Sequence, residues 1–343
     1  QIYLDNYKFS KKVLDLNNLN LKKFYSGGIL IHDNNLKLYS NPLFDLFAKN
    51  NNIWQEIIPL TAVFFNSIFD NKYEKSTKNW IDNDFKTSHS FKLFAKSFLR
   101  GVLLDEDLKI DKSIALYYLK LFSLGHATIP EYGMHEIPKQ IYSKIDNKNK
   151  VIFNEEVKLI ENNKILTNEG NEYLANNIII ATDLKSINNI FKLGIEDVER
   201  EVTNLYFKTD EKFLDFPGIY LNGNQNDIIN HFCMPNLISD KYSPIGQNLL
   251  SISLFNSKLN QKEIIQQVKR ELKGIFGSVT DNLELIKIDS YFNDCFMPQG
   301  IDVKKMINNN NSNIYFCGGY ISNSSIESAI KSSENLADYL IRN

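Results

Sequence analysis

The sequence predicts a mixed α/β protein in which two units alternate along the chain. Helical patterns come first, strand patterns follow, and the chain closes with a strand, two glycines and a long helix at 313–343. Strand and helix patterns at 131–185 and 313–343 are typical of one α/β unit. Residues 1–130, which are mainly helical, and 186–312, which are mainly strands, are expected to form the second unit with an antiparallel sheet.

The composition indicates a folded protein with a large core. The chain has 343 residues, of which 43% are hydrophobic, and its net charge is −2. This length suits about two domains of roughly 150 residues, and the composition excludes general disorder. A charge this close to zero gives no indication of nucleic acid as a partner. Cys233, Cys295 and Cys317 are scattered without a C-x-x-C motif, which favours a reducing, cytoplasmic location.

Two helices are predicted before residue 130. The first carries an apolar stripe at helical spacing, formed by Phe91, Phe94, Ala95, Phe98, Leu99 and Val102. The second follows Asp111, a residue type that caps helix N-termini. We interpret the phenylalanine stripe as packing rather than as a cofactor contact, because large apolar residues at this spacing are usually buried.

A run of strands is predicted after Gly133. The stretch "GMHEIPKQIYSKI" indicates a loop that enters a helix, and the strands "VIFNEEVKLIE" and "KILTNEG" follow with a turn at Asn162-Asn163. The run "NIIIAT" has the unbroken β-branched character of a strand that is buried on both faces of a parallel sheet.

The last strand and helix, in "NIYFCGGYISNSSIESAIKSSENLADYL", suggest a ligand site. The glycine pair 318–319 would let a planar or phosphate group approach the backbone. Ser324 and Glu327 fit a capping box, which places the amides of Ser325 and Ile326 in the first helical turn, where a helix cannot satisfy them. The alternative is an ordinary capped turn in which the glycines serve only the bend.

Three stretches, in this order, resemble the flavin-dependent amine oxidase superfamily, especially its phytoene-desaturase-like and protoporphyrinogen-oxidase-like members. The first is "FLRGVLLDEDLKIDKSIALYYLKLF". The second runs from "GMHEIPKQIYSKI" through "VIFNEEVKLI" to the strand ending in Ala-Thr, and the third is "IYFCGGYISNSSIESAIKSSENLA". The resemblance implies an FAD-binding, Rossmann-like domain from 131–185 and 313–343, and a substrate domain from 1–130 and 186–312.

The resemblance also implies a set of FAD contacts. The main chain of Val157 would meet the adenine, and Ala181 and Thr182 would pack near the dinucleotide. The remaining contacts would face the flavin from the last strand and helix, through Gly318, Gly319, Ser325 and Ile326.

Two features depart from the family pattern. The family begins with a G-x-G-x-x-G turn that holds the pyrophosphate. These 343 residues contain no such motif, and "YSGGILIHD" lacks its spacing. We therefore expect an FAD-binding domain that is incomplete at its N-terminus, in a fragment of a longer protein. Gly319 stands where the family usually has an Asp that binds a ribityl hydroxyl. Glycine has no side chain that could make that hydrogen bond.

The reaction expected from the resemblance is hydride removal from a hydrophobic small molecule. Amine oxidases often place a Lys opposite the flavin, whereas Asn204 occupies a plausible counterpart here and Lys208 lies past it. No catalytic acid or base is evident, and the five histidines lack metal-ligand spacing. Some aromatic residues could line a substrate tunnel or, alternatively, fill the sheet core: Phe207, Tyr220, Phe232 and Tyr291.

Two other functions remain open at this point. A degenerate relative could have lost FAD and could bind an apolar ligand or a partner without catalysis; the missing motif and Gly319 favour it. A peripheral membrane protein could instead draw a lipid-soluble substrate through residues 53–69, which are too short and too interrupted to span a bilayer. The sequence does not indicate an oligomeric state.

Overall fold

The computed structural model divides into two compact units, and we describe each by itself. Unit 1 comprises Gln1–Asn6, Leu16–Glu136 and Glu201–Tyr291. Unit 2 comprises Tyr7–Asp15, Ile137–Arg200 and Phe292–Asn343. The structure describes residues 2–40, 75–84, 88–145, 151–161, 163–195, 199–224, 227–255, 259–294, 313–321 and 324–342. The assignment of a cofactor domain and a substrate domain, with the predicted boundaries, stays a prediction.

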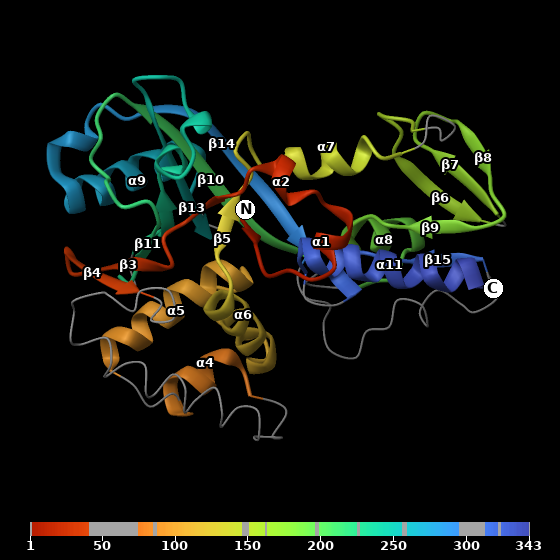
Figure 1. Cartoon of the computed structure of the whole chain (residues 1–343), viewed down its shortest axis with the longest axis horizontal. Coiled ribbons are helices and arrows are strands. Elements are labelled where there is room, and N and C mark those ends of the chain that lie inside the picture. The colour runs from red at the N-terminus through yellow and green to blue at the C-terminus, as the bar shows by residue number, and fades with distance from the viewer. Residues whose placement is uncertain are drawn as a thin grey trace. The chain divides into compact units, whose positions relative to one another are not determined.

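A seven-stranded sheet is the centre of unit 1 (Figure 1). Its strands lie in the order β14 (Glu284–Asp294), β10 (Glu199–Thr209), β13 (Asn248–Phe255), β12 (Ile229–Cys233), β11 (Ile219–Asn222), β3 (Gly27–His32) and β4 (Asn35–Ser40). From β10 to β11 the neighbours are antiparallel, as are β3 and β4, whereas β11 and β3 are parallel. Side chains therefore alternate between two faces of the sheet.

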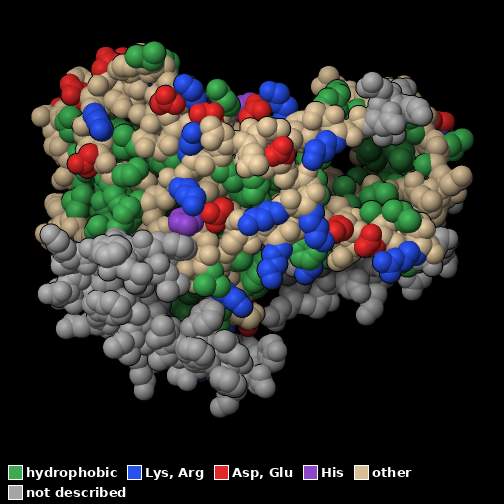
Figure 2. All heavy atoms as spheres, in the orientation of Figure 1, with side chains coloured by type: hydrophobic (Ala, Val, Ile, Leu, Met, Phe, Trp, Pro, Cys, Tyr) green, Lys and Arg blue, Asp and Glu red, His purple; other side chains and the backbone are tan. Residues whose placement is uncertain are grey.

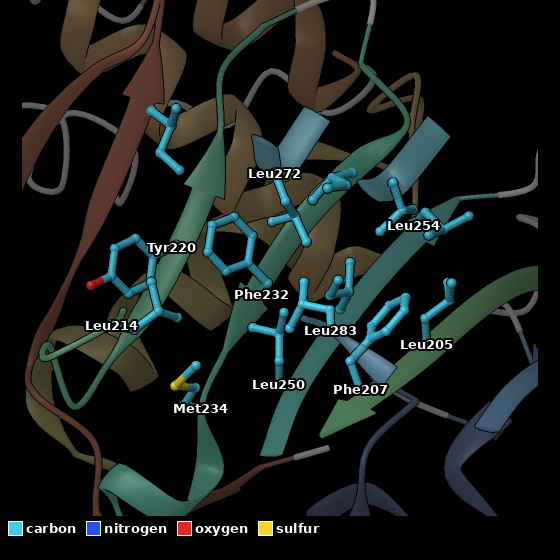
Figure 3. Packing of buried hydrophobic residues seen from close by; sticks show 14 of the residues in the cluster. Leu205, Phe207, Leu214, Tyr220, Phe232, Met234, Leu250, Leu254, Leu272 and Leu283 are labelled. Carbon is cyan, nitrogen blue, oxygen red and sulfur yellow. The ribbon is translucent and has the colours of Figure 1, made fainter. Parts of the chain in front are cut away.

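One face of this sheet packs on helix α9 (Gln261–Phe276). The helix begins at a capping box in which Asn260 and Glu263 exchange hydrogen bonds of 3.1 and 2.9 Å. Strand and helix residues interlock in one core (Figure 3), which includes Leu205, Phe207, Tyr220, Phe232, Met234, Leu250, Ile252, Leu254, Ile264, Val268 and Leu272. Aromatic side chains such as Phe207, Tyr220 and Phe232 fill part of this core.

The predicted N-terminal helices are confirmed. Helix α5 (His89–Leu103) buries Phe91, Ala95 and Leu99 on one face, and Asp111 accepts a 2.8 Å hydrogen bond from the Ser113 amide at the start of α6 (Lys112–Leu124).

The other elements of unit 1 are short: α2 (Leu16–Leu19), α4 (Thr77–Asn79), a π-helical turn (Trp80–Asp84), 3₁₀ turns at Pro235–Leu237, Asp240–Tyr242 and Gly277–Thr280, and a sheet of β1 (Tyr3–Leu4), β5 (Ala127–Ile129) and β2 (Lys22–Lys23).

Unit 2 is smaller and its core is built mostly of isoleucine. It contains α1 (Ser10–Val13), α7 (Glu136–Tyr142), α8 (Leu184–Phe191), a 3₁₀ turn at Gly319–Ile321, α11 (Ile326–Arg342), a sheet of β6 (Val157–Glu161), β7 (Lys164–Thr167) and β8 (Glu172–Leu174), and the parallel pair β9 (Ile178–Ile180) and β15 (Ile314–Phe316). We call its core the isoleucine core, made of Ile160, Ile178, Ile180, Leu184, Ile187, Ile190, Ile195, Ile314 and Tyr320.

The predicted strands of unit 2 form, with one correction. The hairpin β6–β7 is present, and Asn163 takes a positive φ of 65° at its turn. The expectation that "NIIIAT" is buried on both faces is wrong, because Ile179 is 51% exposed while Ile178 and Ile180 are buried. Among the described strands β9 pairs only with β15, and the apolar side of α8 joins the core on one face.

The described surface mixes both signs of charge. Figure 2 shows basic and acidic side chains interspersed with hydrophobic ones on the face that it draws. Within the described ranges, no helix is both long enough and apolar enough to cross a membrane. The segment proposed for membrane contact, 53–69, lies outside the described residues.

Candidate functional site

Four of the predicted FAD contacts lie at one edge of unit 2, which we call the carboxyl edge. The parallel strands β9 and β15 pair with Ile178 opposite Ile314 and Ile180 opposite Phe316. The amide of Cys317 continues the ladder with a 3.1 Å hydrogen bond to the Ile180 carbonyl. The pairs 181–182 and 318–319 therefore leave the two strands side by side, where ligands of α/β proteins usually bind.

The two glycines at this edge have different roles. Gly318 has φ of 153°, and a Cβ added there would lie 2.6 Å from the Tyr320 ring. Tyr320 is fixed in the isoleucine core with 2% exposure, so only glycine fits position 318 without a shift. A Cβ at Gly319 would meet the Ser325 nitrogen at 3.4 Å, an ordinary contact. Position 319 therefore has room for a side chain.

Helix α11 begins one residue later than the sequence predicts. Ser324 lies in a turn with φ of 30°, and its amide donates to the Gly319 carbonyl at 3.1 Å. The hydroxyl of Ser325 accepts the amide of Ser328 at 3.2 Å, which makes Ser325 the N-cap. The predicted cap at Ser324 is wrong because the bond to Gly319 holds that residue outside the extended conformation of an N-cap.

Glu327 does not complete a capping box with Ser324. Its carboxylate is buried and accepts the amides of Lys8, Phe9 and Ser10 at 2.6, 2.8 and 2.9 Å. These partners lie more than 300 positions away along the chain, so no local pattern could have revealed them. The first turn of α11 is thus fixed by the N-terminal segment of the same unit.

The amides of Ser325 and Ile326 have no hydrogen-bond partner within the described part of the chain. They stand at the start of a 17-residue helix, where free donors and the helix dipole favour negative charge. They fit the ring edge of FAD, which becomes negative on reduction. The fit is incomplete at Gly319, because no carboxylate is present there to bind a ribityl hydroxyl.

The other predicted contacts differ in accessibility. Ala181 is exposed, and the half-buried Thr182 donates from its hydroxyl to Asp183 at 3.1 Å, at the start of α8. Val157 lies apart from the β9–β15 pair, in the sheet of β6, where it pairs with Thr167 and packs half-buried on the isoleucine core. The cofactor roles of all seven residues stay predictions.

A second cluster lies in unit 1, on the sheet face opposite the core. We call Asn204, Ser253 and His231 the neutral row, because they follow one another in register across β10, β13 and β12. Asn204 and Ser253 are hydrogen-bonded side chain to side chain. All three are partly exposed, whereas Leu205, Ile252, Leu254 and Phe232, which neighbour them along the strands, belong to the core on α9.

The two titratable side chains that β12 contributes to this face, His231 and Cys233, are uncharged at neutral pH. Burial lowers the pKa of His231 to about 4 and raises the pKa of Cys233 to about 11. The Nδ1 atom of His231 lies 2.8 Å from the side-chain Nδ2 atom of Asn230. Because Nδ2 can only donate, Nδ1 accepts this hydrogen bond and Nε2 carries the ring proton. Sequence reasoning missed this cluster because only the strand register brings its members together.

The aromatic residues proposed for a substrate tunnel fill the core. Phe207, Tyr220 and Phe232 are 0%, 3% and 0% exposed, and the rings of Tyr220 and Phe232 stack at 5.1 Å. The tunnel interpretation is therefore wrong for these three residues, and the alternative of a packed sheet core is confirmed. The side chain of Tyr291 lies outside the described residues.

Metal-binding geometry is absent from the part of the chain that the structure describes. No group of three His, Cys, Asp or Glu side chains is placed there to hold an ion. Cys233 and Cys317 are free thiols.

Solved structures of an oxidoreductase and of two oxidases share this fold. An oxidoreductase from Methanosarcina mazei is 16% identical and has a TM-score of 0.68, over 93% of this chain and 82% of that chain. Putrescine oxidase bound to putrescine is 12% identical with a TM-score of 0.67, over 100% and 87%. Cyclohexylamine oxidase from Brevibacterium oxydans is 11% identical with a TM-score of 0.66, over 99% and 87%. Identities this low show the fold alone.

A comparison with curated proteins finds no match. The family model for flavin-containing amine oxidoreductases matches residues 61–341. This range includes most of the seven-stranded sheet, the parallel strands β9 and β15, and the start of α11. The chain therefore belongs to the flavin-containing amine oxidoreductase family.

Proposed function

We propose that this FAD-dependent oxidoreductase removes hydride from a hydrophobic small molecule that is uncharged at its reacting group. Membership of the family makes FAD its cofactor and oxidation–reduction its chemistry. The nature of the substrate is the proposed part. It rests on one observation, the uncharged character of the row formed by Asn204, Ser253 and His231.

The neutral row favours an uncharged substrate on electrostatic grounds. An ammonium group that leaves water needs an anionic or strongly polar partner, because an unpaired buried charge is costly. The row offers an amide, a hydroxyl and a neutral imidazole, and Cys233 beside it remains a protonated thiol. Such groups can orient an alcohol, a carbonyl or a pyrrole by hydrogen bonds without holding a cation.

The cofactor would be held by unit 2. When bound, FAD supplies the hydride acceptor. The amides of Ser325 and Ile326 would donate to the ring edge that gains negative charge, and the glycine pair 318–319 would admit the ring to the backbone. Within unit 1, the Nε2–H of His231 would donate a hydrogen bond to an oxygen or nitrogen atom of the substrate, as a positioning group rather than a base.

The experiment that tests this proposal is anaerobic reduction of the protein-bound flavin by candidate substrates. We expect bleaching of the visible flavin band by conjugated polyenes or porphyrinogens, and no bleaching by alkylamines of similar size. Reduction by the amines alone would overturn the proposal. Failure of the purified protein to bind any FAD would instead contradict the cofactor assignment in unit 2.

A matched pair of variants makes the test specific to the neutral row. Asn204→Lys should slow flavin reduction by the neutral substrate at least tenfold, because it places a charge in the row, while FAD content stays the same. Lys208→Asn is the control on the same strand, where the native Lys pairs with Glu284 at 2.8 Å outside the row. Equal rates in both variants would show that the row does not contact the substrate.

A further inference from the structure

The contact between Glu327 and the N-terminal segment joins the first turn of α11 to residues 8–10. One buried carboxylate receives three consecutive backbone amides, with Lys8 and Phe9 on Oε1 and Ser10 on Oε2. Charge-assisted hydrogen bonds of this kind are short and about twice as strong as neutral ones. We call this arrangement the Glu327 clamp.

The clamp acts on the turn that carries the proposed flavin donors. Glu327 follows Ser325 by two residues and Ile326 by one, in the first turn of α11. Because the helix backbone is rigid over one turn, an anchor at Glu327 fixes the direction in which the Ser325 and Ile326 amides point. The bond from Ser324 to the Gly319 carbonyl fixes the other side of the same turn.

The N-terminal segment is held in place independently of the clamp. The backbone of Asp15 exchanges hydrogen bonds of 2.8 and 3.0 Å with the Gln140 side chain on α7. Lys12 forms a 2.7 Å ion pair with Glu334 on α11, and Lys331 lies 5.4 Å from the centre of the Phe9 ring. The segment is therefore anchored to α7 at Asp15 and joined to α11 at further points besides Glu327.

We propose that Glu327 is a positioning residue for the flavin, and that the docked segment 7–15 is a required part of the cofactor site. This inference rests on the proposed placement of FAD at the start of α11. The three amide dipoles also point at the carboxylate and offset part of its charge near the start of α11. No contact between Glu327 and the cofactor itself is required.

The decisive variant is Glu327→Asp, which keeps the charge and shortens its reach by one methylene group. We expect the dissociation constant of FAD to rise about tenfold in the full-length protein. Reduced flavin should lose more affinity than oxidised flavin, because the amides stabilise charge that is present only after reduction. If reduced flavin loses ten times more affinity than oxidised flavin, the midpoint potential of the bound flavin falls by about 30 mV for the two-electron couple.

Three comparisons keep the test conclusive. Glu327→Gln, which turns an amide group toward three donors, should weaken FAD at least as much as Glu327→Asp. Asp338→Glu and Asp338→Asn change an exposed carboxylate on the same helix and should leave affinity and potential unchanged. A purely structural role would lower the unfolding temperature of the Glu327 variants while FAD affinity and potential stay at the wild-type values, and that result would overturn the inference.

The same measurements distinguish a failure of the Glu327 clamp from a failure of the proposed cofactor site. Wild-type protein that binds no FAD would contradict the site at α11 itself. Wild-type protein that binds FAD normally, together with unchanged binding in both Glu327 variants, would contradict only the role of the clamp.

Discussion

The middle of α9 in unit 1 and the start of α11 in unit 2 use the same polar device in different surroundings. Glu271 on α9 accepts the amides of Ile228 and Ile229 at 3.0 and 3.1 Å and the Gln267 side chain at 2.6 Å. Glu327 on α11 accepts three consecutive amides at 2.6–2.9 Å. Both carboxylates are buried, with 8% and 6% exposure.

The difference lies in what each carboxylate holds. Glu271 secures the start of β12 beside an aromatic and aliphatic core, and burial raises the pKa of its carboxyl group. Glu327 secures a turn whose neighbouring amides, at Ser325 and Ile326, have no hydrogen-bond partner among the residues that the structure describes. The same interaction therefore supports packing in one unit and orientation of donors in the other. Variants on the two sides should affect stability and FAD binding separately.

The largest effect is expected on the core side. Phe232→Ala removes a fully buried ring that stacks on Tyr220, and such truncations cost about 3–5 kcal/mol of unfolding free energy. Urea unfolding followed by circular dichroism measures the loss. The control is Leu174→Ala, at an 81% exposed position, which should change the unfolding free energy by less than about 0.5 kcal/mol. Similar losses in both variants would show that the core around Phe232 is not packed as described.

A smaller effect, on the ligand side, is expected from Gly319→Asp. The site has room for a Cβ, and a carboxylate there could accept a hydrogen bond from a ribityl hydroxyl of FAD. A charge-assisted hydrogen bond contributes roughly 1.5 kcal/mol or more, which corresponds to about tenfold tighter binding. Fluorescence titration of the apoprotein with FAD measures it. Gly274→Asp, at an open position of α9, is the control, and unchanged or weaker binding in Gly319→Asp would place the flavin elsewhere.

The smallest effect concerns the pH dependence contributed by Glu271. Because its pKa is raised in the folded state, the unfolded chain releases this proton first as the pH rises. Protonated Glu271 makes its full contribution to the unfolding free energy below its pKa in the unfolded chain, near 4.5. This contribution is lost as the pH rises through the pKa of Glu271 in the folded protein. Glu271→Gln should remove this decrease, which urea unfolding at a series of pH values measures. Parallel stability curves for both proteins would contradict the assignment.

Local signals predicted the elements well. The apolar stripe of α5 and the cap at Asp111 depend on residues within four positions of one another, and both form as expected. The resemblance placed the strands of β9 and β15 in one FAD-binding domain, and the structure shows that they pair side by side. Long-range partners were not predictable in this way, and Glu327 is the clearest example.

The errors at the candidate site have related physical causes. The capping-box spacing to Glu327 favours Ser324 by sequence, but the bond from Ser324 to Gly319 makes Ser325 the cap in the structure. The aromatic residues of β10, β11 and β12 leave both a tunnel and a core open by sequence, and the position of α9 on that face decides for the core. The neutral row depends on a strand register that alternation alone cannot set, because several registers keep the same faces.

The Glu327 clamp joins positions separated by 317–319 residues, which has a consequence for biosynthesis. Translation proceeds from the N-terminus, and early segments leave the ribosome before later ones exist. The amides of residues 8–10 must therefore stay hydrated until α11 has been made. The proposed cofactor site cannot be completed before the last helix emerges, and a nascent chain that stops short of α11 would lack it.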